Sequence, residues 1–166
     1  MTFLFILSVL GGFLFTESAY CSLGIAVDNT SYDFGSMTYG GTEETAPSWL
    51  GIKNTSGTGE GKYYQTLYIQ VAGATSPWQA GASSGVNQFQ MESYFDGGWH
   101  TLGSGQIMLK EYLPHGSEYN DMKTGFRFTA PAEGSEGGEK QISVGLVCCP
   151  VEGYLYNVVA DIFYLN

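Results

Sequence analysis

The sequence predicts an all-β fold, an antiparallel sandwich of about seven to nine strands, from three observations. Short segments alternate between apolar and polar residues, turn residues separate these segments, and no helical period is sustained after residue 20. The composition agrees, since the chain has 24 Gly and only 13% charged residues, against about 25% in ordinary globular proteins. We therefore expect short strands and tight turns rather than long helices, which Gly and β-branched residues weaken.

The expected strands combine β-forming residues with a period of two. The clearest is Lys62 to Val71, whose apolar residues Leu67, Ile69 and Val71 share one face. Asp96-Gly97-Gly98 predicts a hairpin turn. Gln106 to Leu113 fits either a strand or a short helix. The other expected strands are Leu23 to Val27, Tyr32 to Phe34, Pro47 to Lys53, Asn87 to Phe95, Trp99 to Leu102, Thr124 to Thr129, Gln141 to Cys149 and Tyr154 to Leu165.

Residues 1–20 form a separate N-terminal segment, and residues 21–166 are expected to form the sandwich domain. Thr2 to Phe15 are almost wholly apolar, a run shorter than the about 20 residues of a membrane span. Such a run is typical of a signal peptide, although no Lys or Arg precedes it. The alternative is a retained apolar helix that serves as an anchor or a filament core. We expect an extracellular or cell-surface location, with no membrane span beyond this segment.

Export makes disulfides and glycosylation relevant. The three cysteines are Cys21, Cys148 and Cys149. Cys21 precedes the first expected strand and the other two end a late one, so a bond between Cys21 and one of the pair is one interpretation. A vicinal Cys148–Cys149 bridge and two buried thiols are the alternatives. Asn29 and Asn54 each begin Asn-Thr-Ser, an acceptor pattern for glycosylation, and both lie in expected turns.

The charge balance is acidic, with 6 Lys+Arg against 16 Asp+Glu, which disfavours binding to nucleic acid or to an anionic membrane. With only His100 and His115 and no CxxC pattern, we expect no zinc site. No cofactor is expected. Calcium is the one metal that carboxylates in loops would suit, although no DxDxDG pattern is present. The carboxylates concerned are Asp96, Asp121, Glu133, Glu136 and Glu139.

We expect no enzymatic activity, because no nucleophile elbow is present and the two histidines fit a strand and a Pro-Gly loop. The aromatic residues are better candidates for binding, since they can stack on sugar rings. Trp49 and Trp99 lie in expected strands and are predicted to pack in the core. Trp78 follows Pro77 in an expected loop, which makes it the best candidate for a ligand or subunit contact. Its alternative role is a lid over one end of the sandwich.

Three segments resemble secreted bacterial or archaeal sandwich domains. They are residues 22–41 (SLGIAVDNTSYDFGSMTYGG), 49–57 (WLGIKNTSG) and 125–148 (GFRFTAPAEGSEGGEKQISVGLVC). The resemblance implies an antiparallel immunoglobulin-like β-sandwich at the cell surface and carries no catalytic residue. Similar modules serve as surface-layer parts, filament subunits and adhesins. The N-terminus resembles type IV pilins in its Met-Thr start and apolar run, and departs from them at Phe5, where pilins usually carry Glu.

The function expected first is a non-catalytic structural subunit of an extracellular filament, pilus-like, or of a surface layer. Sandwich subunits often join by strand addition, and the terminal segments Tyr20 to Val27 and Tyr154 to Leu165 suit this role. Both segments can instead pair inside their own domain. The alternative function is a carbohydrate-binding or adhesin module. The expected partners are accordingly further copies of the chain, or a glycan.

Overall fold

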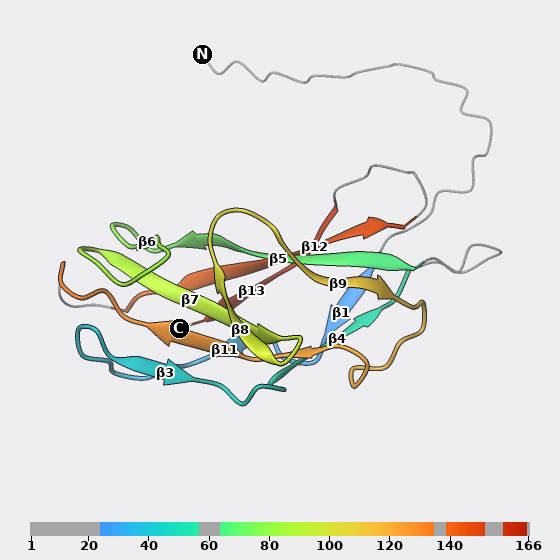
Figure 1. Cartoon of the computed structure of the whole chain (residues 1–166), viewed down its shortest axis with the longest axis horizontal. Coiled ribbons are helices and arrows are strands. Elements are labelled where there is room, and N and C mark those ends of the chain that lie inside the picture. Colours follow the sequence, from blue (N-terminus) through green and yellow to red (C-terminus); the bar gives the residue numbers. More distant parts are fainter. Residues whose placement is uncertain (1–23, 57–63, 135–138, 152–157, 166) are drawn as a thin grey trace, which may run out of the picture.

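The computed structural model describes residues 24–56, 64–134, 139–151 and 158–165, and these residues form strands and no helix (Figure 1). The predicted all-β fold is therefore confirmed, and the leader or helix of residues 1–20 lies outside the described residues. The strands are β1 (Ile25–Val27), β2 (Ser31–Tyr32), β3 (Thr42–Glu44), β4 (Leu50–Asn54), β5 (Gln65–Ala74), β6 (Gln79–Ala80), β7 (Gln88–Phe95), β8 (Gly98–Leu102), β9 (Ile107–Leu113), β10 (Lys123–Thr124), β11 (Phe126–Thr129), β12 (Ile142–Pro150) and β13 (Val158–Leu165).

The strands form a sandwich-like arrangement of two larger sheets and one small one. One five-stranded sheet has the order β2-β13-β12-β5-β9, and the other has β3-β11-β7-β6 with β8 also paired to β7. The small sheet has the order β1-β4-β10. In Figure 1, β5, β12 and β9 lie above β7, β8 and β11, so the two larger sheets face each other. Most neighbouring strands are antiparallel, and the exceptions are the short pairings β13–β2 and β6–β7.

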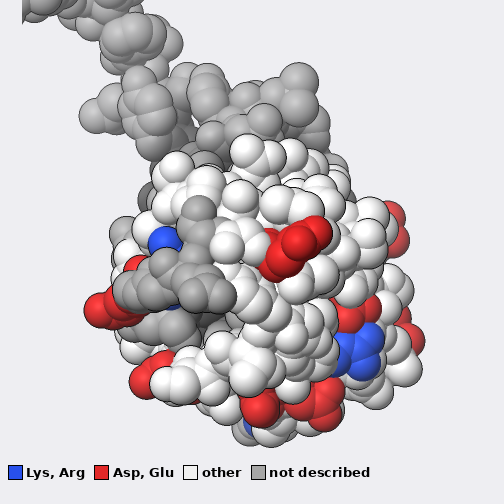
Figure 2. Space-filling model, turned by 90° about the vertical axis from the view of Figure 1, so that its left-hand side faces the viewer, with Lys and Arg blue, Asp and Glu red and all other residues white. Residues whose placement is uncertain are grey.

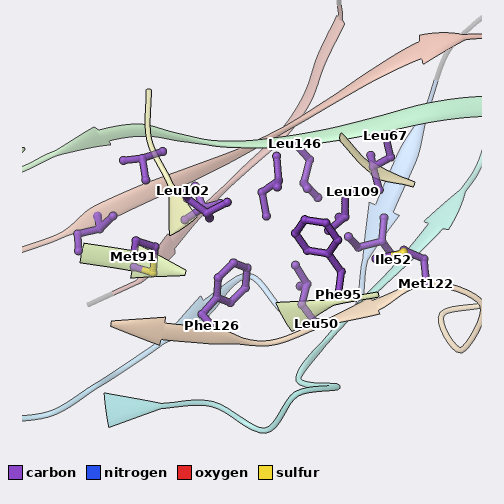
Figure 3. Close-up of a cluster of buried hydrophobic side chains, with 14 of the residues drawn as sticks. Leu50, Ile52, Leu67, Met91, Phe95, Leu102, Leu109, Met122, Phe126 and Leu146 are labelled. Carbon is purple, nitrogen blue, oxygen red and sulfur yellow. The ribbon is translucent and has the colours of Figure 1, made fainter. Parts of the chain in front are cut away.

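The core fills the space between the two larger sheets. Leu67 and Leu146 point into it from β5 and β12, and Met91 and Phe126 approach from β7 and β11 (Figure 3). The alternation predicted for β5 holds, because every second residue of the strand is buried from Gln65 to Val71. Each fully buried side chain of this size contributes about 1.5–3 kcal/mol relative to an exposed one. The other core residues include Leu50, Ile52, Phe95, Leu102, Leu109 and Met122.

The hairpin predicted at Asp96-Gly97-Gly98 joins β7 to β8. Phe95 pairs with Gly98, which leaves a turn of two residues. Asp96 has φ of 49° and Gly97 has φ of 79°, and positive φ at both positions matches the type I′ turn that suits the twist of two antiparallel strands. This turn fixes the register of β8, and hence the face on which Trp99 lies.

The structure contains more strands than the predicted seven to nine, for a physical reason. β6 and β10 have only two residues each and β3 only three, which no periodicity can reveal. The segment predicted as one strand from Thr124 to Thr129 is divided at Gly125 into β10, on β4, and β11, on β7. A side chain at Gly125 would collide with the carbonyl oxygen of Ala46, so the chain crosses between sheets where only glycine fits. Residues 107–113, undecided from sequence, form the strand β9.

Candidate interaction surfaces

Trp78, the predicted contact residue, is half-buried and packs against the core. Its ring stacks on Phe128 with centroids 6.0 Å apart and lies 6.2 Å from Phe89. The indole Nε1 atom is buried and has no hydrogen-bond partner. Trp78 therefore covers one end of the aromatic core, in line with the lid interpretation. Its role in contacting a ligand or subunit stays a prediction.

Trp49 and Trp99 were both predicted in the core, and the prediction is correct only for Trp49. Trp49 packs against the core, 5.9 Å from the Phe126 ring. Trp99 lies on the outer face of the β7–β8–β11 sheet, because it pairs with Tyr94 across the hairpin and both side chains point away from the core. On that face its ring lies 4.7 Å from the guanidinium carbon of Arg127. A cation over an indole ring is an attractive contact, so this pairing fixes the Trp99 ring.

The outer face also carries a close ion pair between β7 and β11. Arg127 Nε donates to Glu92 Oε2 at 2.7 Å, and the two residues pair directly across the strands. This hydrogen bond, with the negative charges of Glu92 and Glu44, raises the pKa of Arg127 above its ordinary value. The guanidinium therefore stays charged throughout the pH range in which proteins are handled, and it holds Glu92 and Trp99 together.

We expect Glu92→Gln to lower the free energy of unfolding by about 1 kcal/mol, because the pair is only partly shielded from water. The substitution keeps the side-chain shape and removes the charge that pairs with Arg127 at 2.7 Å. Urea denaturation monitored by tryptophan fluorescence measures the change. Glu43→Gln on the exposed strand β3 is the control and should stay within about 0.5 kcal/mol of the wild type. Equal effects of the two substitutions would show that the ion pair contributes nothing.

Exposed tyrosines gather on the outer face of β5 and β9. Tyr64 and Tyr112 are 55% and 52% exposed, and their rings meet edge to face with centroids 6.5 Å apart. Further along the same two strands, Tyr68 pairs with Met108, which is 48% exposed. Leu67 and Ile69, which alternate with the tyrosines along β5, are buried in the core. Tyr64, Tyr68, Met108 and Tyr112 therefore share the opposite face, which is turned toward solvent. We call Tyr64, Tyr68, Met108 and Tyr112 the tyrosine face.

A shallow depression adjoins the tyrosine face. Its volume is about 330 Å³, at the lower end of the range of about 300–1,000 Å³ found for small-molecule sites. Met108 and Tyr112 of the tyrosine face contribute to its lining, together with the amino group of Lys110 and two carboxylates. The amino group and the carboxylates can form hydrogen bonds with hydroxyl groups. Its lining residues are Asp96, Met108, Leu109, Lys110, Glu111 and Tyr112.

The outer edge of β13 is a second feature that bears on binding. β13 pairs with β12 along most of its length, from Val158 to Leu165. Among the described strands, β2 pairs with β13 on its other edge at Tyr164 and Leu165, and β1 also lies near β13. Residues 158–165 of the C-terminal segment therefore pair inside their own domain, as one of the two predicted interpretations had it, and residues 154–157 lie outside the described residues. β1, at the other terminus of the described chain, likewise pairs with β4.

Neither histidine lies in an arrangement that resembles a catalytic site. The His100 ring stacks on Phe95 at 4.0 Å, and its Nε2 atom lies 3.2 Å from the Phe95 carbonyl oxygen. His115 follows β9, and its buried Nδ1 atom has no hydrogen-bond partner. No histidine lines the depression beside the tyrosine face.

Among the residues that the structure describes, no group of three or more His, Cys, Asp or Glu side chains gathers closely enough to hold a metal ion. Of the loop carboxylates considered for calcium, Glu136 lies outside the described residues. Asp121 accepts a hydrogen bond from the backbone N–H of Glu118 at 2.9 Å, so it caps its own turn. Asp96 takes part in the hairpin turn, and Glu133 and Glu139 are exposed.

The prediction that Asn54 lies in a turn is wrong, and its burial opposes the predicted glycan in the folded domain, where glycosylation stays a prediction. Asn54 is the last residue of β4 and is only 1% exposed. Its Nδ2 atom, the atom to which a glycan would attach, donates to the Leu113 carbonyl oxygen at 2.9 Å. Asn29 is half-buried, and its Nδ2 donates to the Trp49 carbonyl oxygen at 2.7 Å and to Asp28. Glycosylation at Asn29 stays a prediction.

Cys148 and Cys149 are consecutive residues of β12, and their surroundings differ. Cys148 belongs to the core with Leu146 and Val144, two and four residues earlier. Cys149 is half-buried, and burial raises the pKa of its thiol. Since neighbouring strand residues point to opposite faces, the extended strand does not favour the vicinal bridge. Cys21 lies outside the described residues, so its bond to either cysteine stays a prediction.

The surface carries few positive charges. Figure 2 shows one end of the molecule, where carboxylates lie at separate places and Lys and Arg are sparse. The described residues include no helix that is both long and apolar enough to cross a membrane. The fold and its surfaces define an all-β, sandwich-like protein. Its sequence matches no protein-family model, and no characterised protein matches it significantly.

Proposed function

We propose that the chain is a non-catalytic structural subunit of an extracellular filament or surface layer, joined to its neighbours through sheet edges. The observation that supports this most concerns the outer edge of β13. There, β2 pairs with only two residues of β13, Tyr164 and Leu165. An edge strand offers its unpaired N–H and C=O groups to any strand that approaches it. A neighbouring subunit can therefore extend the five-stranded sheet at β13 by strand addition.

Two other edge strands, β9 and β3, carry features that oppose strand addition, which favours β13 over them. β9 includes Lys110 and Glu111, and its pairing with β5 shifts register at two places. β3 has three residues, of which two are Glu. Charges, irregular register and short length are the devices by which proteins protect exposed edges. β13 spans eight residues with the sequence VVADIFYL, in which Asp161 is the one charged residue.

The location and the lack of catalysis rest on further observations. The apolar run from Thr2 to Phe15 favours export. His100 is stacked on Phe95 with its Nε2 at the carbonyl oxygen of the same residue, a placement that suits structure rather than proton transfer. The low content of charged residues, 13%, suits a subunit whose surfaces are covered by its neighbours.

Proline at position 160 tests the role of β13 with little damage to its own sheet. Leu146 of β12 pairs with Asp161, and the next residue, Val147, pairs with Val159. Ala160 is therefore the extra residue of a β-bulge and has no partner residue on β12. A bulge leaves its extra residue outside the hydrogen-bond ladder, and proline is tolerated there. Ala160→Pro therefore removes an N–H group and places a ring at the strand edge while the β12–β13 ladder remains.

We expect the full wild-type chain to form filaments or sheets in electron micrographs as its concentration rises. Ala160→Pro should raise the concentration needed by about tenfold or more, while the control Ala160→Val, which keeps the N–H group, should polymerise like the wild type. Circular dichroism and thermal melting establish that the variants are folded. A wild-type chain that sediments as a monomer at every concentration would end the proposal, as would unchanged polymers of Ala160→Pro.

Carbohydrate binding is the second candidate function. The observation that favours it is the tyrosine face beside the depression of about 330 Å³, whereas Trp78 is half-buried against Phe89 and Phe128. Exposed aromatic rings next to polar side chains are suited to sugars, which present both C–H groups and hydroxyl groups.

A further inference from the structure

We infer that the tyrosine face binds a neutral oligosaccharide, an inference that deepens the second candidate function and is independent of filament assembly. Four of the large apolar or aromatic residues that are exposed lie on the outer face of the β9–β5–β12 sheet. Val151, at the end of β12, adjoins Tyr64 through a backbone hydrogen bond from its N–H to the Tyr64 carbonyl oxygen at 3.1 Å. The four residues are Tyr64, Met108, Tyr112 and Val151.

The size of this surface argues for a small ligand rather than a second copy of the chain. At about 200 Å² for each large side chain, the exposed parts of Tyr64, Tyr112 and Met108 amount to about 300 Å². A stable dimer buries about 800 Å² on each partner, which is more than twice this area. Exposed apolar patches of about 300–600 Å² on monomers are often functional. The tyrosine face therefore suits a ligand of a few rings.

The geometry of the rings suits a saccharide. The rings of Tyr64 and Tyr112 meet at an interplanar angle of 82°. They therefore form a corner that offers a ligand the face of one ring and the edge of the other. The negative face of an aromatic ring attracts the slightly positive C–H groups of a pyranose. Tyr68 lies four residues beyond Tyr64 on the same face, about 13 Å along the strand, which extends the surface over more than one sugar.

The charges beside the rings favour a neutral sugar over an acidic one. The depression brings Asp96, Glu111 and Lys110 to its lining, which is two carboxylates against one amino group. The whole chain has a formal net charge of −10, so uronic acids, sialic acids and sulfated sugars meet repulsion. Hydroxyl groups of a neutral sugar can donate to the carboxylates and accept from the lysine without this penalty.

Binding of the full chain to a glycan array tests the inference, with neutral oligomers of glucose, galactose, mannose and N-acetylglucosamine beside acidic glycans. We expect a neutral oligosaccharide to bind to the chain. Titration calorimetry should show saturable binding and give its dissociation constant. Tyr112→Ala should weaken that affinity about tenfold or more, and Tyr112→Phe should retain most of it. Tyr39→Ala is the matched control, because Tyr39 is 41% exposed and lies outside the tyrosine face.

Each contrary result has a distinct meaning. Binding only to acidic glycans would overturn the neutral ligand while leaving carbohydrate binding in place. No binding to any glycan would overturn both the neutral ligand and carbohydrate binding at the tyrosine face. Binding that Tyr64→Ala and Tyr112→Ala leave unchanged would overturn them as well. Sedimentation could instead show that the wild-type chain is a dimer and that the Tyr112→Ala variant is a monomer. That result would mean that a second copy of the chain covers the tyrosine face. None of these outcomes depends on polymerisation at β13, because the tyrosine face lies on β5 and β9.

Discussion

Phe126→Ala will lower the free energy of unfolding by about 4 kcal/mol, the largest effect expected of a single substitution in the core. Phe126 is fully buried on β11 and points into the space between the sheets (Figure 3). Its ring contacts the edge of Trp49 with centroids 5.9 Å apart. Removal leaves a cavity where the two larger sheets meet, and the rigid strands around it can close it only in part.

Urea denaturation followed by fluorescence measures this loss, and two variants control for it. Phe126→Leu keeps much of the volume and should cost less than about 1.5 kcal/mol. Tyr112→Ala removes an aromatic ring of similar size from the surface and should stay within about 0.5 kcal/mol of the wild type. A loss below about 1 kcal/mol for Phe126→Ala would mean that Phe126 does not fill the core as described.

Asn54→Ala will lower the free energy of unfolding by about 3 kcal/mol, because it leaves buried polar groups without partners. The Asn54 Oδ1 atom accepts from the Ser56 N–H at 2.8 Å, and its Nδ2 donates to the Leu113 carbonyl oxygen at 2.9 Å. The side chain thus joins β4, β9 and the loop after β4. At about 3 °C for each kcal/mol, the melting temperature should fall by about 9 °C.

Asn54→Asp and Asn29→Ala separate the causes of this loss. Asn54→Asp keeps the acceptor oxygens but removes the donor to Leu113, so it should also destabilise the domain strongly. Asn29→Ala removes a half-buried bond to the Trp49 carbonyl oxygen and should cost only about 1 kcal/mol. If Asn54→Ala proved no worse than Asn29→Ala, the buried network around β4 would not be a source of stability.

The sequence predicts the long strands well and the placement of single side chains less well. β5, β7 and β12 follow from their alternation, and the β7–β8 turn follows from Asp96-Gly97, which readily adopt positive φ. Short pieces such as β6 exist only because a neighbouring strand offers hydrogen-bond partners, and nothing local encodes them. The same limit explains why residues 107–113 were undecided, since β9 is held as a strand by its pairing with β5.

Two errors arose because strand parity was not applied. Trp99 was assigned to the core because it lies in an expected strand, yet Leu102 is the buried residue of β8 and Trp99 has the opposite parity. Asn54 was assigned to a turn as part of Asn-Thr-Ser, although it continues the buried series of Leu50 and Ile52. In both cases the alternation already present in the sequence carried the correct signal.

The candidate surfaces were less accessible to sequence reasoning, because they depend on which strands become neighbours. The alternation around Leu67 implies that Tyr64 and Tyr68 lie on the opposite face, but their proximity to Tyr112 and Met108 requires the β5–β9 register. Trp78 was singled out for its place after Pro77, whereas the rings of Phe89 and Phe128, which partly bury it, come from distant segments. The short pairing of β2 with β13 likewise follows only from the order of strands in the sheet.

The parallel pairing of β2 with β13 joins residues near the two ends of the described chain. During synthesis, β2 emerges long before its partner, and β12 also lacks one neighbour until residues 158–165 have appeared. The five-stranded sheet therefore reaches its full width only as a late event, after most of the chain has been synthesised. Contacts so distant in sequence form slowly, so the folding chain passes through a period in which β2 and β12 each lack a neighbouring strand. A chaperone that shields the edge of β12 during this period would limit aggregation through that edge.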